Sequence, residues 1–173
     1  MPATDKQGET MDIRTYGDPV LRRTAKPVET IDDEIRDICR RMVEEMLRAD
    51  GVGLAAPQIG IPLRIIVLDV EGEFHVLINP ELLFVSEETE TGIEGCLSVP
   101  GVHAEVARSA QATIAGTTLG GERVEITGEG LLARAMQHEM DHINGHLFVD
   151  HVSQVKRRSL IKEFERKKRE SEE

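Results

Sequence analysis

The segment His138-Glu139-Met140-Asp141-His142 places two histidines four residues apart, with an acidic residue directly after the first. On a helix this spacing puts both rings on one face, about one turn apart, so both can bind one metal ion. Glu139 would then reach water on that metal as a general base. Leu131 and Ala135 share the same helical face, so the histidines extend an apolar, inward stripe. The alternative is a helix that carries two histidines by chance.

A catalytic metal needs a third protein ligand and an open position for water. Glu163 and Glu165 are the acidic residues nearest to where a thermolysin-like protease supplies that ligand, but they lie in a charged, surface-like segment. The metzincin continuation is also missing, because Asn144-Gly145-His146 falls at the wrong spacing. Cys96, in residues 94–98, is the best ligand that remains, since a thiolate binds metals strongly. By chemistry alone, one cysteine with two histidines favours zinc.

Three helices and several strand-like runs are predicted around these residues. An apolar residue at every third or fourth position indicates a helix over residues 30–50, capped by Thr30. The histidine pair lies on a second helix over 130–144, and a charged third helix covers 154–169. The strand-like runs cover residues 64–70, 74–79, 82–88, 102–108, 110–117 and 123–126. This order predicts an α+β fold, with antiparallel β-sheets packed around the central helix that bears H-E-x-x-H and with an N-terminal and a C-terminal helix.

Length and composition favour one compact catalytic unit. The 173 residues divide into a loose tail at 1–10, a catalytic domain at 11–153 and a basic helix with a frayed end at 154–173. A polar start and no apolar run of membrane-spanning length predict no signal peptide and no membrane partner. The chain is therefore expected in the cytoplasm, where Cys39 and Cys96 stay reduced. The net charge of -11 and the 3% aromatic content argue against DNA binding.

Three segments stand in order along the chain, namely residues 51–58 (Gly-Val-Gly-Leu-Ala-Ala-Pro-Gln), residues 94–98 and residues 138–142. They resemble the signature motifs of the peptide deformylase family, G-x-G-x-A-A-x-Q, E-G-C-x-S and H-E-x-x-H, with every fixed position matched. The resemblance runs from near Tyr16 to about Asp150. It implies a metal-dependent hydrolase that removes the N-terminal formyl group from the formyl-methionine of newly synthesised polypeptides and releases formate.

The resemblance also implies which residues carry the chemistry. The metal ligands would be Cys96, His138 and His142. Glu139 would be the general acid and base, and Gln58 with the backbone N–H of Leu97 would stabilise the oxyanion. The family further corrects the choice of metal, because deformylases typically work with Fe²⁺, one ion per chain, for which Ni²⁺, Co²⁺ or Zn²⁺ can substitute.

The same resemblance implies where the formyl-methionyl peptide lies. The peptide would add as a strand along the backbone of Val52, Gly53, Gly95 and Leu97. Its methionine side chain would enter an apolar pocket lined by Val52, Leu131, Ala135, His138 and the stem of Arg134. Glu94 is expected to pair with Arg108 and hold the cysteine loop. Some members carry an arginine near the second substrate residue, where this chain has His103.

From Lys156 to Arg169, eight basic residues stand against two acidic ones. This pattern is typical of a solvated helix face; resemblance to bacterial members with a basic C-terminal helix implies instead docking to ribosomal RNA.

Two other functions stay open. A metalloprotease that cuts internal peptide bonds shares the helix motif but leaves Gln58 and Cys96 unexplained. A non-catalytic protein with a structural metal would usually supply four ligands, and three are found.

Overall fold

The computed structural model describes residues 12–172, so the predicted tail at 1–10 lies outside the described residues. The helices are α1 (Asp33–Arg48), α2 (Gly130–Ile143) and α3 (Gln154–Ser171). The strands are β1 (Gly53–Ala55), β2 (Ile65–Val70), β3 (Glu73–Val85), β4 (Thr89–Cys96), β5 (Val99–Ser109), β6 (Gln111–Thr117) and β7 (Arg123–Glu129). Short 3₁₀ turns lie at Pro19–Arg22, Ala56–Ile59 and Phe148–His151.

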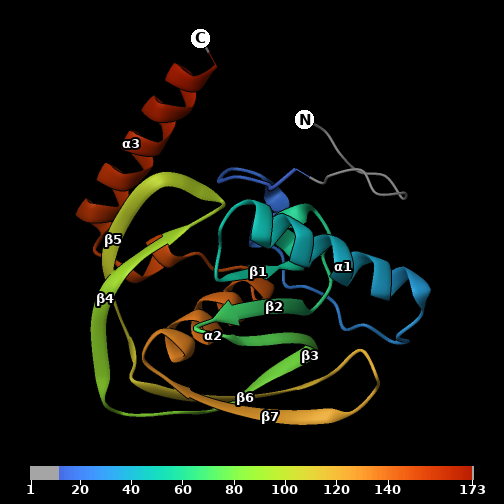
Figure 1. Cartoon of the computed structure of the whole chain (residues 1–173). Helices are drawn as coiled ribbons and strands as arrows, with labels where there is room; N and C mark the ends of the chain where they lie inside the picture. Colours follow the sequence, from blue (N-terminus) through green and yellow to red (C-terminus); the bar gives the residue numbers. More distant parts are fainter. Residues whose placement is uncertain (1–11, 173) are drawn as a thin grey trace.

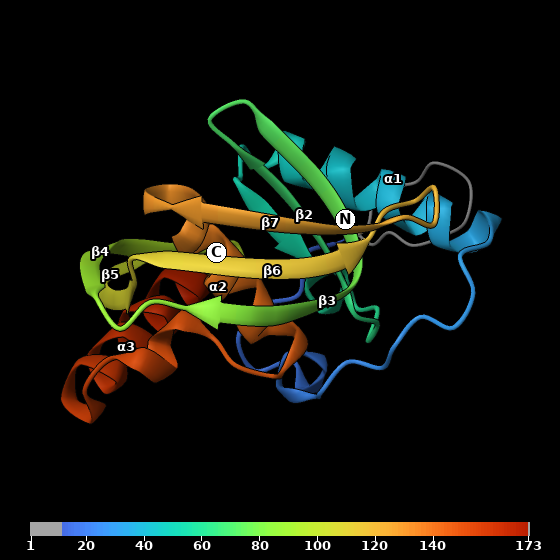
Figure 2. The same cartoon turned by 90° about the horizontal axis from the view of Figure 1, so that it is seen from below.

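The strands form two antiparallel sheets. The larger sheet has the order β1-β2-β3-β6-β7, and β4 pairs with β5 in a separate hairpin. Figure 1 shows this hairpin as a curved arm beside the larger sheet, and α2 packs against both. α1 contacts β1 and β2, and α3 lies along the outside of β5 (Figures 1 and 2). The predicted α+β fold, with antiparallel sheets around the helix that bears H-E-x-x-H, is confirmed.

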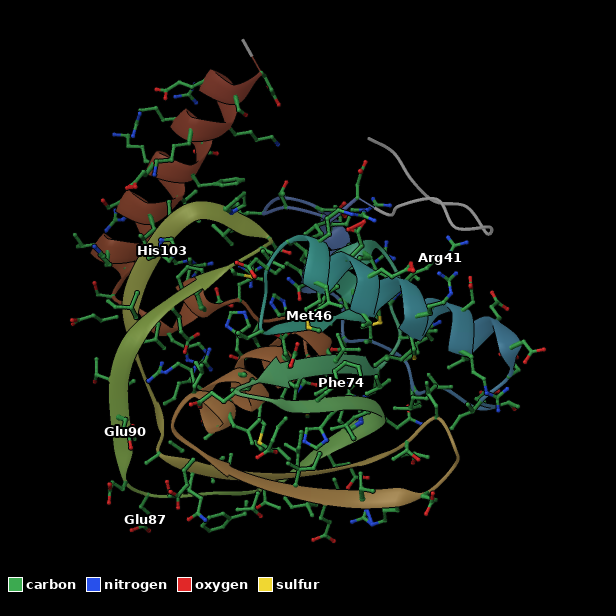
Figure 3. All side chains as sticks on the ribbon, in the orientation of Figure 1. Arg41, Met46, Phe74, Glu87, Glu90 and His103 are labelled. Carbon is green, nitrogen blue, oxygen red and sulfur yellow. The ribbon has the colours of Figure 1, made fainter. Side chains whose placement is uncertain are left out.

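Strand β2 is buried on both faces and thereby anchors two helices. Successive side chains of a strand point to opposite faces, so β2 supplies two apolar rows. Ile66 and Leu68 pack in one core cluster with Met136 of α2. Ile65 and Val67 pack in another with Met42 and Met46 of α1, and Figure 3 shows Met46 between α1 and the sheet. Because α2 is held by the first cluster, the side chains on its opposite face have fixed positions.

Helix α3 is attached by apolar packing and by polar contacts of Lys167 and Arg157. Leu160 and Phe164 are buried in a third cluster with β5 and the Phe148–His151 turn. Lys167 Nζ donates a hydrogen bond of 2.6 Å to the Gly101 carbonyl of β5. Most of the remaining α3 side chains face solvent. Within residues 12–172, no helix combines the length and the apolar character that crossing a bilayer demands.

The start of the first predicted helix was wrong by a few residues. α1 begins at Asp33, and its cap is Asp32 rather than Thr30. The Asp32 side chain accepts the Ile35 N–H at 3.0 Å, which satisfies one of the free donors of the first turn. The predicted apolar stripe is confirmed in part, because Ile35, Met42 and Met46 are buried while other members are half-buried.

The strand predictions need two corrections. Residues 74–79 and 82–88 were predicted as two strands, but β3 runs unbroken from Glu73 to Val85. A register shift follows Ile78, so Pro80, which has no N–H, falls at the irregular point of the strand. Strands β1 and β4 were not predicted, because β1 lies in a glycine-rich segment and β4 consists mostly of polar residues and two glycines.

Candidate metal and peptide site

Three ligand atoms converge at the junction of α2 and the β4–β5 hairpin. Cys96 Sγ lies 3.3 Å from His142 Nε2, which in turn lies 3.3 Å from His138 Nε2. All three atoms lie within 4.8 Å of one another. The histidines come from successive turns of α2, and the cysteine ends β4. The structure therefore brings together the three residues that the sequence predicted as metal ligands.

The distances between these atoms fit a divalent metal ion. Tetrahedral bonds of about 2.0–2.1 Å to nitrogen and 2.3 Å to sulfur separate neighbouring ligand atoms by about 3.3–3.6 Å. The observed 3.3 Å separations agree with this geometry. Three protein ligands leave one position of a tetrahedron open, as catalytic sites require. The residues present therefore fit a catalytic ion better than a structural one.

The charges at the site favour the ligand form of Cys96, because the two histidines stabilise its thiolate. Burial raises the pKa of Cys96, but His142 and His138 outweigh it and hold that pKa well below its usual range. The thiolate, which is the form that binds metals, is thereby favoured. Burial lowers the pKa of His138, but hydrogen bonds to Cys96 and Glu94 outweigh it and raise that pKa. His138 Nδ1 lies 3.0 Å from Glu94 Oε1, so Nε2 is the ring nitrogen directed at the cluster.

Glu139 places a carboxylate beside the three ligands. The side chain is buried and lines the same cavity, and burial raises the pKa of its carboxyl group. Among the described residues, Glu139 Oε1 has no hydrogen-bond partner. A buried acceptor usually has a partner, so this oxygen is available to a molecule bound in the cavity. A carboxyl group with a raised pKa is suited to exchange protons near neutral pH.

Gln58 is held between β1 and the cysteine loop. Its Oε1 accepts the Ala55 N–H at 2.9 Å, and its Nε2 donates to Ser98 Oγ at 3.1 Å. The same amide nitrogen lies 3.7 Å from Cys96 Sγ. Ser98, which is fully buried, also donates its backbone N–H to Cys96 Sγ at 3.4 Å. This role of Ser98 was not predicted, although its fixed place in E-G-C-x-S was a signal in the sequence.

A cavity of about 500 Å³ is lined by two of the three ligands, Cys96 and His138, and by Gln58 and Glu139. All the residues predicted to contact the peptide line it, namely Val52, Gly53, Gly95, Leu97, Leu131, Arg134 and Ala135. Leu131 was predicted on an inward stripe, but it is 45% exposed because it borders the cavity instead of packing in the core. His103 also lines the cavity and lies against Gly95, where an added Cβ would stand 2.5 Å from its ring.

A buried carboxylate network supports the ligands. Arg108 Nε and Nη2 donate to the two oxygens of Glu94 at 2.8 and 2.9 Å, which confirms the predicted pairing. Arg108 Nη1 also donates to Asp141 at 2.7 Å, and Asp141 lies 2.8 Å from His151 Nε2. Burial raises the pKa of Glu94, but Arg108 and His138 outweigh it and hold that pKa far below its usual range. Glu94 is therefore a carboxylate that can orient His138.

Comparisons with known proteins agree with one another. A family model described as polypeptide deformylase matches residues 10–158. A peptide deformylase of Bartonella bacilliformis is 44% identical over 165 residues, covering 89% of this chain and 91% of that protein. A crystal structure of a peptide deformylase from Legionella pneumophila superposes with a TM-score of 0.90 at 43% identity, covering 94% of this chain and 97% of that one. A peptide deformylase from Synechococcus elongatus, solved in complex with actinonin, gives a TM-score of 0.85 at 42% identity, covering 94% and 91%.

Proposed function

This chain belongs to the polypeptide deformylase family, and we propose that it carries out the family's reaction in the cavity lined by Cys96, His138 and Glu139. The enzyme is a metal-dependent hydrolase that removes the N-terminal formyl group from newly made polypeptides. The single observation that carries the site assignment is the convergence of the three ligand atoms beside the free oxygen of Glu139.

The proposed metal ligands are Cys96 Sγ and the Nε2 atoms of His138 and His142. A divalent ion bound there would act as a Lewis acid and lower the pKa of water. We propose Fe²⁺ as the native ion on the strength of the family resemblance, since the ligands alone would favour zinc. Ni²⁺, Co²⁺ and Zn²⁺ are proposed substitutes. Metal analysis of protein purified without oxygen from its natural source tests this choice.

In the proposed mechanism, Glu139 moves the protons. Its free Oε1 accepts a proton from the water that attacks the formyl carbon. The Gln58 amide and the Leu97 N–H donate hydrogen bonds to the formyl oxygen as negative charge grows on it. Loss of one such donor typically raises the barrier by about 2.7–4 kcal/mol. Glu139 then gives the proton to the departing amine nitrogen as the C–N bond breaks, and formate leaves.

The proposed peptide position follows the free edge of β4. Among residues 12–172, this strand pairs only with β5, so its other edge offers backbone groups to an added strand. Gly95, Leu97, Val52 and Gly53 line the cavity along this path. The methionine side chain would occupy the part of the cavity bordered by Leu131, Ala135, His138, Val52 and the stem of Arg134.

Formate release from formyl-Met-Ala-Ser tests the function. The protein is purified anaerobically, supplied with Fe²⁺ or Ni²⁺, and compared with Glu139→Ala. Rapid release that the substitution abolishes, with metal still bound, is the expected result. No release by metal-loaded wild type would overturn the proposal. Casein digestion by the wild type would then favour a protease that cuts internal peptide bonds. A lack of casein digestion would favour a protein with a structural metal.

We also propose that α3 docks on ribosomal RNA and that the enzyme works in the cytoplasm. Leu160 and Phe164 turn one side of α3 to β5, where Lys167 also binds, and Arg157 pairs with Asp150. The other basic side chains of α3 lie along its remaining sides, namely Lys156, Arg158, Lys162, Arg166, Lys168 and Arg169. Residues 11–153 would then form the catalytic domain and 154–173 the docking helix. Binding to purified ribosomes should weaken steeply as salt rises, and salt-independent binding would contradict it.

A further inference from the structure

Arg134 connects α2 to both strands of the β4–β5 hairpin. Its Nη1 donates to Glu94 Oε2 at 2.6 Å and to the Val106 carbonyl at 2.9 Å. Its Nη2 donates to the Glu90 carbonyl at 2.8 Å. Glu90 lies on β4 (Figure 3) and Val106 on β5. The guanidinium is therefore occupied by the hairpin, and only the stem is available to the cavity that Arg134 lines.

Glu94 connects Arg134 to His138, a proposed metal ligand. Its Oε2 accepts from Arg134 and Arg108, and its Oε1 lies 3.0 Å from His138 Nδ1. A carboxylate on the far nitrogen of a ligating histidine fixes the tautomer and the orientation of the ring. Arg134 is one helical turn before His138, so the guanidinium and the imidazole reach the same carboxylate from one face of α2.

Two guanidinium groups, of Arg108 and Arg134, balance the charge of two carboxylates in this network. Glu94 and Asp141 are two carboxylates that share Arg108. Arg134 adds the other guanidinium, at 2.6 Å from Glu94. Glu94 is 5% exposed, so losing Arg134 would leave carboxylate charge with little solvent to compensate it. Glu94 would then shift towards Arg108, and the support of His138 would weaken.

We propose that Arg134 is a positioning residue of the metal site, which acts through Glu94 on His138 and through the Glu90 and Val106 carbonyls on the hairpin that carries Cys96. This inference rests on the proposed function, because it takes Cys96 and His138 as metal ligands. It goes beyond the role of Arg134 as a pocket wall, in which only the aliphatic stem matters. If Arg134 positions the ligands, removing its guanidinium should lower the metal affinity. If Arg134 is only a pocket wall, the metal affinity should not change.

The test compares three full-length variants for binding of Co²⁺ alone. Arg134→Met keeps the stem and removes every donor, and Arg134→Lys keeps one cation. Arg123→Met, on β7, makes the same chemical change at an exposed arginine that forms an ion pair with Glu125. Metal-stripped proteins are titrated with Co²⁺ against a chelating dye, and visible absorption reports the cysteine–cobalt bond. Circular dichroism identifies the variants that are folded.

Arg134→Met should bind Co²⁺ about 10–100-fold more weakly than wild type. Arg134→Lys should lie between the two, and Arg123→Met should match wild type. Wild-type Co²⁺ affinity in Arg134→Met, with a raised KM, would overturn the inference and leave the pocket-wall role. If Arg134→Met does not fold, Arg134→Lys decides: weakened binding supports the inference, and wild-type affinity overturns it. Failure of wild type itself to bind Co²⁺ would count against the proposed function instead.

Discussion

The carboxylate of Glu139 rests against the backbone of Gly53: a Cβ atom on Gly53 would lie 2.6 Å from Glu139 Oε2. Gly53 belongs to β1 and Glu139 to α2, so the absence of one side chain sets how closely strand and helix approach at the site. Gly53 was predicted to lie along the bound peptide. The structure adds that Gly53 also leaves space for the carboxylate of Glu139, the proposed proton carrier.

Gly53→Ala should therefore reduce turnover without removing metal. The new methyl group would push the Glu139 carboxylate by several tenths of an ångström or more, because 2.6 Å is shorter than real Cβ contacts. A displacement of this order at a reacting group can cost about 10²-fold in rate. Formate release and metal content are measured together. Gly120→Ala, whose Cβ would meet nothing closer than 3.8 Å, is the control. Wild-type kcat in Gly53→Ala would contradict the prediction.

Cys96→Ala should lose metal while keeping the fold. Cys96 is the proposed ligand from the hairpin, and α2 supplies the other two proposed ligands. Metal content after purification and dialysis is the measurement. Cys39→Ala makes the same chemical change at the thiol buried in the α1 core, where burial raises the pKa to about 11, and should keep its metal. A metal-loaded Cys96→Ala protein would exclude Cys96 as a ligand.

Residues that are close along the chain could be placed from the sequence. His138 and His142 stand on one helix, whose geometry fixes their separation, and the apolar stripe of α2 indicated which way they face. The positions of Cys96 and Gln58 relative to α2 could not be predicted in this way, because the residues around them give no sign that a strand end and a 3₁₀ turn meet that helix. They were placed through the order of three motifs and the resemblance those motifs carry. The structure brings all four side chains together.

Other features depend on tertiary contacts that the sequence does not encode locally. β4 could not be predicted from apolar alternation, since its one buried residue is the charged Glu94 and its Ile93 is exposed. Ser98 looks like an ordinary loop serine, and its burial against Gln58 follows from folding. Arg134 was expected to offer its stem to the pocket. Its three hydrogen bonds to the hairpin arise only after α2 docks.

Phe164→Ala should destabilise the protein by about 3–5 kcal/mol, the usual cost of truncating a buried phenylalanine. Phe164 is 3% exposed, and its ring meets Tyr16 edge-on at 6.0 Å between centroids. It also packs in the cluster that contains Val99 and Val102 of β5, close to Cys96. Urea unfolding monitored by circular dichroism gives the free energy. Val155→Ala, on the same helix but 73% exposed, should change it by less than about 0.5 kcal/mol. Equal effects of the two substitutions would show that α3 does not contribute to the core.

Asp150→Asn should destabilise the protein near neutral pH and progressively less in acid. Asp150 accepts bonds from Arg22 at 2.7 and 3.2 Å and from the Leu147 N–H at 3.0 Å. Burial raises the pKa of Asp150, but Arg22 and the Leu147 N–H outweigh it, so the folded pKa lies below its usual range. In the unfolded chain an aspartate titrates near pH 3.9, at about its ordinary value.

The sign of this effect follows from the lowered pKa. The unfolded state binds the proton first as the pH falls, so the stability from Asp150 is complete above about pH 3.9 and is lost as the pH drops through the folded pKa. Unfolding free energies of wild type and Asp150→Asn are measured from pH 7 to pH 2.5, and their difference should shrink towards the acid end. Glu87→Gln, an exposed change of the same kind between β3 and β4 (Figure 3), serves as the control. A difference for Asp150→Asn that stays constant with pH would mean that its charge contributes nothing to folding.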